Sequence, residues 1–160
     1  MARPFRVRDS RIHGKGVFAT EDIPAGTELI EYTGKLITRA EADELYDEIY
    51  SGHTFLMELT EDWIIDANQN GNDARWINHS CAPNCIPYQH EHPTDPLKNK
   101  VIIESSRDIK KGEELTYDYG ISFDIPYTER LKKIWACHCG APNCSGTMLK
   151  PYEPEREERD

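Results

Sequence analysis

The sequence contains five cysteines, and three of them lie in the short segment Cys137-His-Cys-Gly-Ala-Pro-Asn-Cys144. Turn-forming residues separate the second and third thiols, a spacing that allows thiolates to converge on one metal ion. A tetrahedral zinc site needs a fourth ligand. The candidates are Cys81, Cys85, His79 and His138. Because an odd number of cysteines without a secretory signal is not typical of a disulfide framework, a metal site is the better interpretation.

A second concentration of reactive groups is Arg75-Trp-Ile-Asn-His-Ser-Cys-Ala-Pro-Asn-Cys85. Here an apolar pair is followed by amide, imidazole, hydroxyl and thiol side chains, and Pro83 then prevents a helix from continuing. Polar groups this dense beside an apolar pair indicate a buried polar loop in which each group has a hydrogen-bond partner. We predict that this loop joins a cofactor pocket to the metal site.

The pattern along the chain predicts a mostly β domain that positions these two segments. Roughly seven short strands are expected. The clearest are at 5–8, 28–37, 54–59, 63–66, 101–106 and 114–119. Thr38 and Glu41 form a capping box, and apolar residues at helical spacing extend the predicted helix to about Tyr50. Strands and helices do not alternate, which argues against a doubly wound parallel sheet.

Weaker patterns complete this picture. Short helices are predicted at 72–77 and 128–135, and a polar surface loop at 89–99. His90 and His92 in that region are better interpreted as surface residues than as metal ligands. Gly14 and Gly16 would let a ligand approach bare backbone, although a lone Gly-x-Gly is more often only a turn.

Composition limits the class of protein. A chain of 160 residues with 38 % hydrophobic and 30 % charged residues fits one globular domain with a real core. No apolar run reaches the length of about 18 residues that would span a membrane. The net charge of −10 argues against direct nucleic-acid binding and for a basic partner such as a Lys/Arg-rich protein tail, although solubility alone explains it as well. Residues 150–160 form an acidic tail without an apolar anchor and are expected to be disordered.

Five motifs, in this order, resemble those of the SET-domain protein lysine methyltransferases. They are Gly14-Lys-Gly-Val-Phe-Ala19, Glu31-Tyr-Thr-Gly34, Arg75-Trp-Ile-Asn-His-Ser-Cys-Ala-Pro-Asn84, Glu114-Leu-Thr-Tyr-Asp-Tyr119 and the cysteine knuckle, which is similar to the post-SET zinc motif. The third motif matches the family pattern almost letter for letter. The resemblance covers roughly residues 5–149 and implies small curved sheets around a pseudoknot at 5–120, followed by a zinc-pinned post-SET segment at 121–149.

The resemblance also implies an activity, the transfer of methyl groups from S-adenosylmethionine to a lysine of a basic protein segment such as a histone tail. Tyr119 then lies at the methyl-transfer centre, and Tyr32 lines the lysine channel. Tyr117 takes the position that sets product multiplicity, where a tyrosine implies mono- or dimethylation. Without the motifs, all three would be interpreted as core aromatic residues.

The same resemblance assigns the cofactor and metal residues. Those expected to contact the cofactor are Lys15, Gly16, Arg75, Asn78, His79, Met148 and Leu149. Those expected to bind zinc are Cys81, Cys137, Cys139 and Cys144. Four thiolates close the zinc site, so the ion is structural. Cys85 is left as a free, buried thiol, and His138 lies outside the ligand set.

Some features depart from the family pattern and leave alternatives open. Lys15 stands where tryptophan is frequent, Lys35 stands where glutamate is common, and there is no cysteine-rich pre-SET region. The alternatives are a non-catalytic SET-fold module that binds peptides, or a methyltransferase for a non-histone protein. The N-terminus lacks the apolar stretch of a secretory signal, so we expect an intracellular protein, cytoplasmic in a bacterium and nuclear or chromatin-associated if it acts on histones. The oligomeric state is not indicated.

Overall fold

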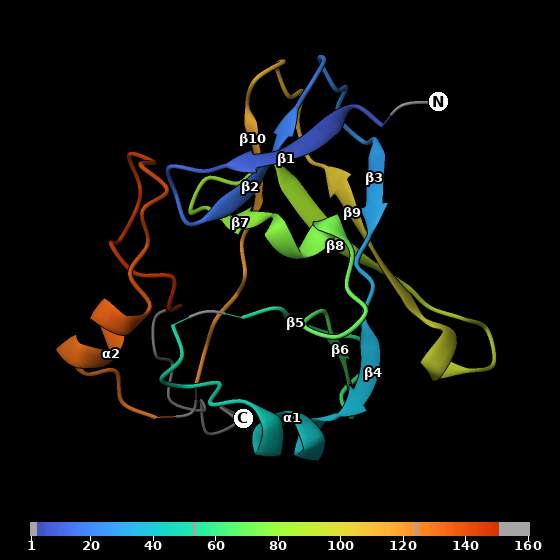
Figure 1. Ribbon diagram of the computed structural model, residues 1–160, viewed down its shortest axis with the longest axis vertical. Helices are drawn as coiled ribbons and strands as arrows, with labels where there is room; N and C mark the ends of the chain where they lie inside the picture. Colours follow the sequence, from blue (N-terminus) through green and yellow to red (C-terminus); the bar gives the residue numbers. More distant parts are fainter. Residues whose placement is uncertain (1–2, 53, 124, 151–160) are drawn as a thin grey trace, which may run out of the picture.

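Three small β-sheets, arranged around short connecting segments, make up most of the fold (Figure 1). The structure is a computed structural model that describes residues 3–52, 54–123 and 125–150. Apart from Lys150, the predicted disordered tail lies outside the described residues. The predicted mostly β class is confirmed, and no described helix is long and apolar enough to cross a bilayer.

The first sheet carries the hairpin near the N-terminus and the predicted tyrosine strand. Its order is β1 (Phe5–Asp9), β2 (Lys15–Ala19), β10 (Glu114–Tyr117) and β7 (Asn78–His79). The first three strands are antiparallel, whereas β10 and β7 are parallel, with Thr116 opposite Asn78 and Tyr117 opposite His79. This pairing places the polar loop directly beside the strand that leads to Tyr119.

The other two sheets are three-stranded and antiparallel. One has the order β3 (Glu28–Glu31), β9 (Lys100–Ser105) and β8 (Cys85–His90), and the other β4 (Lys35–Thr38), β6 (Trp63–Asp66) and β5 (Leu56–Glu58). The prediction of one continuous strand at 28–37 is therefore wrong, because the chain leaves one sheet after β3 and enters another at β4. Gly34 permits this crossing, since a Cβ there would lie 2.5 Å from the carbonyl oxygen of Asp66.

Three further strands, β2, β7 and β8, were not predicted. Gly14 and Gly16 favoured a turn over the segment that forms β2. Pro87 weakened the strand pattern of β8, but β8 lies at a sheet edge, where proline is tolerated. Strand β7 is only two residues long, so it has too little sequence to show a periodic pattern.

The helices are short. They are α1 (Arg39–Leu45), α2 (Glu129–Ile134) and the 3₁₀ segments η1 (Asp73–Trp76) and η2 (Pro96–Lys98). The capping box of Thr38 and Glu41 is present, but the predicted extension of α1 to Tyr50 is wrong. Tyr46 adopts an extended conformation, and its hydroxyl donates a hydrogen bond of 2.6 Å to Asp66. The last turn of α1 also lacks a basic residue that would offset the helix dipole.

The core is divided into small clusters that follow the sheets. One packs β1, β2 and β10 against Ile23, Ile77 and Ile109. Another consists of Leu131, Trp135 and Leu149 and fastens the C-terminal segment to the rest of the domain. A parallel bridge between Ile121 and Leu149 closes this segment. The predicted division at residue 120 stays a prediction.

The buried carboxylate of Asp66 gives a test of this arrangement. Burial acts to raise its pKa, but hydrogen bonds from Tyr46, Gln69 and Asn68 outweigh burial and lower that pKa below its usual value. A lowered folded-state pKa means that this stabilisation is present above the unfolded pKa and is lost as pH falls through the folded pKa. We predict that Asp66→Asn lowers the free energy of unfolding at pH 7 by about 2 kcal/mol and flattens the loss of stability in acid.

Urea denaturation between about pH 3 and pH 7 measures both effects. Asp62→Asn, in an exposed turn, is the matched control and should follow the parent protein. Equal acid slopes for the parent and the Asp66 variant would contradict the prediction.

Candidate functional site

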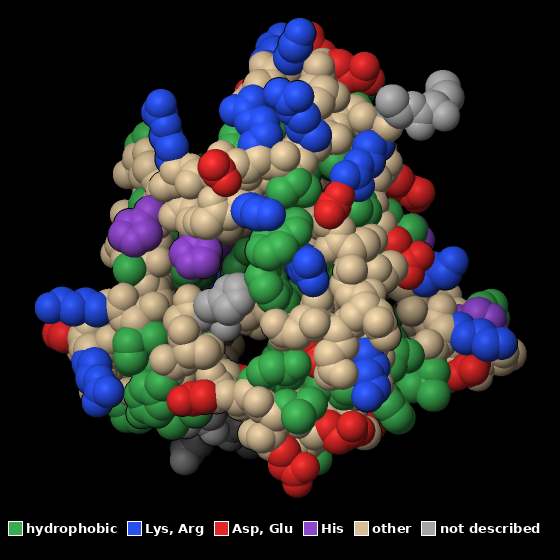
Figure 2. Space-filling model, in the orientation of Figure 1, with side chains coloured by type: hydrophobic (Ala, Val, Ile, Leu, Met, Phe, Trp, Pro, Cys, Tyr) green, Lys and Arg blue, Asp and Glu red, His purple; other side chains and the backbone are tan. Residues whose placement is uncertain are grey.

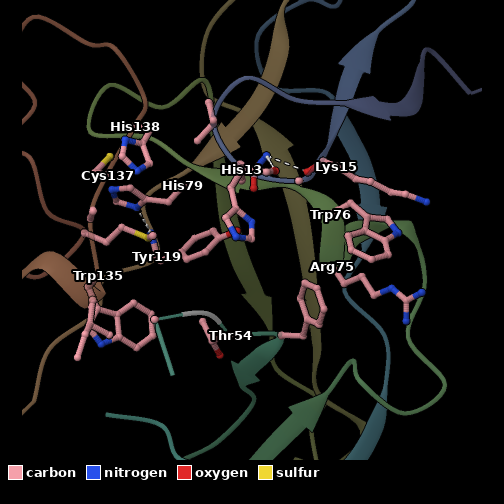
Figure 3. Close-up of a pocket in the computed structure, with 18 of the residues that line it drawn as sticks. His13, Lys15, Thr54, Arg75, Trp76, His79, Tyr119, Trp135, Cys137 and His138 are labelled. Atoms are coloured by element: carbon pink, nitrogen blue, oxygen red, sulfur yellow. Dashed lines mark hydrogen bonds between the residues drawn. The ribbon is translucent and has the colours of Figure 1, made fainter. Parts of the chain in front are cut away.

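A cavity of ≈ 470 Å³ lies between the β1–β2 hairpin tip, the segment from η1 to β7, and the C-terminal segment (Figure 3). This volume suits a small-molecule ligand. Figure 3 shows Lys15, Trp76 and Arg75 at one end and Trp135, Cys137 and His138 at the other. The segment that contains Thr54 and Phe55 also lines the cavity, so at least four sequence-distant parts of the chain contribute walls to it.

Two cations and one indole form the first end. The Arg75 guanidinium lies 4.6 Å from the centre of the Trp76 ring, and the Lys15 ammonium lies 5.4 Å from the same centre. Arg75 Nη1 donates to the Ala67 carbonyl at 3.3 Å, whereas its Nε is buried without a hydrogen-bond partner among the described residues. An unpaired buried donor beside a second cation fits a ligand that carries a carboxylate.

Asn78 holds this cavity in shape. Its Nδ2 donates to the carbonyl oxygens of His13 and Lys15, at 3.2 and 2.9 Å, and to the Glu114 carboxylate at 2.8 Å. The amide nitrogen is thus used to fix the hairpin tip. His79 accepts a hydrogen bond on Nδ1 from the Tyr119 backbone N–H at 3.0 Å, while its Nε2 lies 3.7 Å from the Cys81 sulfur. His79 therefore links the cavity to the cysteines.

The structure brings most of the predicted cofactor residues to this cavity. Those that line it are Lys15, Arg75, Asn78, His79 and Met148. Gly16 does not; it leaves room for the Glu114 carboxylate, which an added Cβ would approach to 2.2 Å. Leu149 does not either, because it is buried against Leu131 and Trp135.

Sequence reasoning missed several aromatic residues of the cavity. Phe55 packs edge-on against Trp76, with ring centres 5.2 Å apart, and Trp135 contributes a wall from the other side. Their only sequence signal is aromatic character within a strand or helix pattern, which also describes core residues. Trp135 is fixed by a hydrogen bond of 2.7 Å from its Nε1 to the Ile49 carbonyl.

A second, more open groove of ≈ 280 Å³ approaches from the other side of Tyr119. It shares Thr54, Tyr119 and Trp135 with the first cavity. Its charged lining residues are three acids and one base, namely Glu48, Glu58, Asp118 and Arg39. A ligand in the groove and a ligand in the first cavity would therefore meet at Tyr119.

The predicted tyrosines are close together but not equivalent. The rings of Tyr117 and Tyr119 lie 4.8 Å apart and both residues line the groove. The Tyr119 hydroxyl donates to the Ile77 carbonyl. Burial, and then the proximity of Tyr117 and Tyr32, raises the pKa of Tyr119 well above its usual value, so the hydroxyl stays neutral. Tyr32 is only 2 % exposed and lines neither cavity, so its place in a lysine channel stays a prediction.

The four predicted zinc-binding cysteines converge. The sulfurs of Cys81, Cys137, Cys139 and Cys144 all lie within 4.8 Å of one another. The sulfurs of Cys81 and Cys137 are 3.9 Å apart, close to the ~3.8 Å expected for two thiolates about 2.3 Å from a tetrahedral zinc ion. Burial acts to raise the pKa of Cys139, but hydrogen bonds from backbone N–H groups lower it to about 6. The donor set and its spacing therefore fit zinc.

Cys85 lies outside this cluster, as predicted. It is 1 % exposed, its thiol donates to the Asn84 side-chain carbonyl at 3.3 Å, and burial raises its pKa to about 12. His90 belongs to a separate grouping with Glu28 and Glu104 on a solvent-facing part of the β3–β9–β8 sheet. His92 uses Nδ1 to accept hydrogen bonds from the N–H groups of Thr94 and Asp95.

The fold and these motifs define a known class of protein. A sequence profile described as SET domain matches residues 14–120, and the chain belongs to this family. The family predicted from the five motifs is therefore confirmed, and the cysteine cluster beyond residue 120 is compatible with a post-SET zinc motif.

Among curated proteins, the chain is similar to several histone-lysine N-methyltransferases. It is 44 % identical over 142 residues to an enzyme from Schizosaccharomyces pombe named as H3 lysine-4 specific, a match that covers 87 % of this chain and 14 % of that protein. The same identity and length relate it to human histone-lysine N-methyltransferase 2D, of which 2 % is covered. It is 38 % identical over 138 residues to Drosophila melanogaster trithorax, covering 84 % of this chain and 3 % of that protein. The chain thus spans a small part of the length of these relatives.

The cysteine geometry yields a prediction that separates two neighbouring thiols. We predict that Cys81→Ala loses the bound zinc, because three thiolates cannot close the tetrahedral site, and that cofactor binding weakens with it. Cys85→Ala should keep a full equivalent of zinc, since this thiol faces Asn84.

Metal analysis of the purified variants, together with calorimetric titration of S-adenosylmethionine, tests both statements. Both substitutions remove one sulfur from the same loop, so each controls for the other. Retention of zinc by the Cys81 variant, or unchanged cofactor affinity after verified zinc loss, would refute the coupling.

Proposed function

We propose that this domain is an S-adenosylmethionine-dependent protein-lysine N-methyltransferase that acts on a basic protein segment. The observation that carries the proposal is that a small-molecule cavity and an acidic groove meet at Tyr119. Membership of the SET-domain family and the names of the relatives support it. Any activity, substrate or partner of a longer protein that contains this domain belongs to the same proposal.

In this proposal the first cavity holds the methyl donor. S-adenosylmethionine, when bound, supplies a methyl group attached to a sulfonium ion for transfer to an ε-amine. Arg75 and Lys15 would bind its carboxylate, because they place two cations beside Trp76. The walls made by Trp135 and Met148 would cover its apolar part and exclude water. Met148 lies at the cavity beside Trp135, to whose carbonyl its backbone N–H donates at 2.8 Å.

The chain's own tyrosines would prepare the amine. Free lysine has a pKa of about 10.4, and a narrow aromatic environment lowers it by disfavouring the charged form. The Tyr119 O–H donates a hydrogen bond to the Ile77 backbone carbonyl, so a lone pair of the hydroxyl oxygen is free to orient the amine. Because the pKa of Tyr119 is raised, its hydroxyl stays protonated, so we assign it the role of positioning the amine and not that of a phenolate that removes a proton. Tyr117, buried beside it, would limit the space for added methyl groups.

The cysteine cluster is proposed to hold one structural zinc ion. Four thiolates leave no open coordination position for a substrate. The cluster joins the polar loop, through Cys81, to the C-terminal segment that carries the other three ligands. Because Cys137 and Met148 also line the first cavity, the ion would stabilise one wall of the cofactor site.

A histone tail is the proposed substrate, with histone H3 as the first candidate. The groove is lined by three carboxylates and one guanidinium. Glu58 pairs with Arg39 and Asp118 pairs with Lys150, which leaves an excess of one carboxylate, Glu48, to favour a basic peptide. One relative is named for H3 lysine 4, and others are named as histone-lysine methyltransferases. A nuclear, chromatin-associated location follows from that choice of substrate.

The first test is a direct assay of methyl transfer. Incubation with labelled S-adenosylmethionine and a panel of histones and other basic proteins should label at least one substrate on lysine. Tyr119→Phe should reduce the rate by about 100-fold or more, because the amine loses its positioning hydroxyl. Tyr88→Phe, which alters an exposed tyrosine on β8, should leave the rate unchanged.

The same assay separates the alternative functions. A folded, zinc-loaded protein that labels no substrate but still binds histone peptides would support a non-catalytic module. Labelling of a non-histone protein in preference to histones would keep the reaction and change the substrate.

Product multiplicity gives a second test. We predict mono- and dimethylated products for the parent protein and a shift toward di- and trimethylation in Tyr117→Phe, since removing the hydroxyl frees space beside the amine. Mass spectra of a modified peptide at matched turnover measure the shift. The idea fails if both proteins give the same proportion of trimethylated product.

A further inference from the structure

Charge is distributed unevenly along this acidic chain. Residues 3–19 contain five Lys or Arg and one Asp, whereas the rest of the sequence contains 14 basic and 28 acidic residues. The β1–β2 hairpin therefore carries a positive charge that the net charge of −10 conceals. Figure 2 shows Lys and Arg side chains gathered over the end of the molecule where Figure 1 places β1 and β2.

Three arginines make up this basic surface. Arg6 and Arg8 alternate with Phe5 and Val7 on β1, so their side chains leave the same face of the strand about 6.6 Å apart. Arg11 follows in the hairpin loop, and all three arginines are exposed. Strand β1 lies at the edge of its sheet, so no other described strand pairs with its outer side.

Within the described ranges, these three arginines lack the acidic partners that Arg39 and Arg107 have. Arg39 pairs with Glu58 at 3.4 Å, and Arg107 pairs with Glu113 at 3.1 Å. Among the residues that the structure describes, no carboxylate lies within 4.0 Å of a charged nitrogen of the basic surface. The Arg8 guanidinium instead stacks over the Phe18 ring, 4.4 Å from its centre, which holds its planar group in place.

We propose that Arg6, Arg8 and Arg11 form a contact surface for the phosphate backbone of duplex DNA. Guanidinium groups bind phosphate oxygens through paired N–H donors, and contacts to the phosphate backbone carry no sequence information. The contact would therefore be independent of sequence and weak, since it involves only about three phosphates. Its function would be to orient the domain and not to select a site.

The choice of DNA rests on the proposed function. A basic histone tail would be repelled by this surface and attracted by the acidic groove, so the surface must serve another partner. Histones are packaged with DNA that wraps around them, so a histone substrate brings DNA phosphates near the domain. The net charge of the whole chain argues against binding to nucleic acid. Because the basic hairpin and the acidic groove lie on different elements, that expectation does not hold for the surface formed by the hairpin.

The test measures DNA binding without any methyl donor. Fluorescence anisotropy of a labelled duplex of about 30 base pairs should show binding by the full chain at about 50 mM salt, and affinity should fall about 40-fold by about 200 mM, the change expected for three phosphate contacts. Replacing Arg6, Arg8 and Arg11 together by Gln should remove most of this salt dependence. The control replaces Lys98, Lys100 and Lys132 by Gln, which changes the net charge equally at other places and should keep the salt dependence.

Three outcomes would overturn the proposal. The first is the absence of DNA binding at low salt, and the second is an equal loss of salt dependence in the arginine and lysine variants. The third is competition by polyglutamate as strong as that by unlabelled duplex, which would indicate an acidic protein partner. Methylation of a histone peptide is measured in parallel and should be the same for the arginine variant and the parent. If the parent protein does not methylate the peptide, the result counts against the proposed function. If it methylates the peptide but does not bind DNA, the result counts only against this inference.

Discussion

The structure depends on two buried amide side chains in the polar loop. Asn78 binds the hairpin tip and Glu114, while Asn84 donates to the Glu114 carbonyl at 2.9 Å and accepts from the Thr116 N–H at 2.9 Å. Together they fasten one loop to two neighbouring strands. Because buried amides are costly when unpaired, these hydrogen bonds fix one arrangement of the loop and not several. The wall shared by the cavity and the groove follows from that arrangement.

The same loop couples two sites of different chemistry. His79 contacts Tyr119 through one ring nitrogen and approaches Cys81 through the other. Only Ser80 therefore separates His79, which lines the first cavity, from Cys81, the first cysteine of the cluster. The C-terminal segment is also held by a small apolar cluster around Trp135 and by backbone pairing of Ile121 with Leu149. A metal ion at the cysteines would thus stabilise a wall that local secondary structure alone cannot hold.

Charge is used differently on the surfaces of the domain. The groove beside Tyr119 carries more acids than bases, and the β1–β2 hairpin carries the reverse. In these proposals the histone tail would bind the acidic groove and the DNA would bind the basic hairpin, and the two surfaces lie on different elements. The acidic excess of the whole chain describes neither surface, because electrostatic attraction is decided by the charges within about a Debye length.

The sequence by itself determined the class of protein, because five motifs with specific side-chain types occur in order, and it identified the four cysteines that the fold brings together. It also predicted most short strands and the α1 capping box, since these depend on local patterns. Only the tertiary structure decided that Trp135 lines both cavities, that Tyr32 lines neither, and that α1 ends at Leu45. These features arise from contacts between distant segments, such as Tyr46 with Asp66 and Trp135 with Ile49, which no local pattern records.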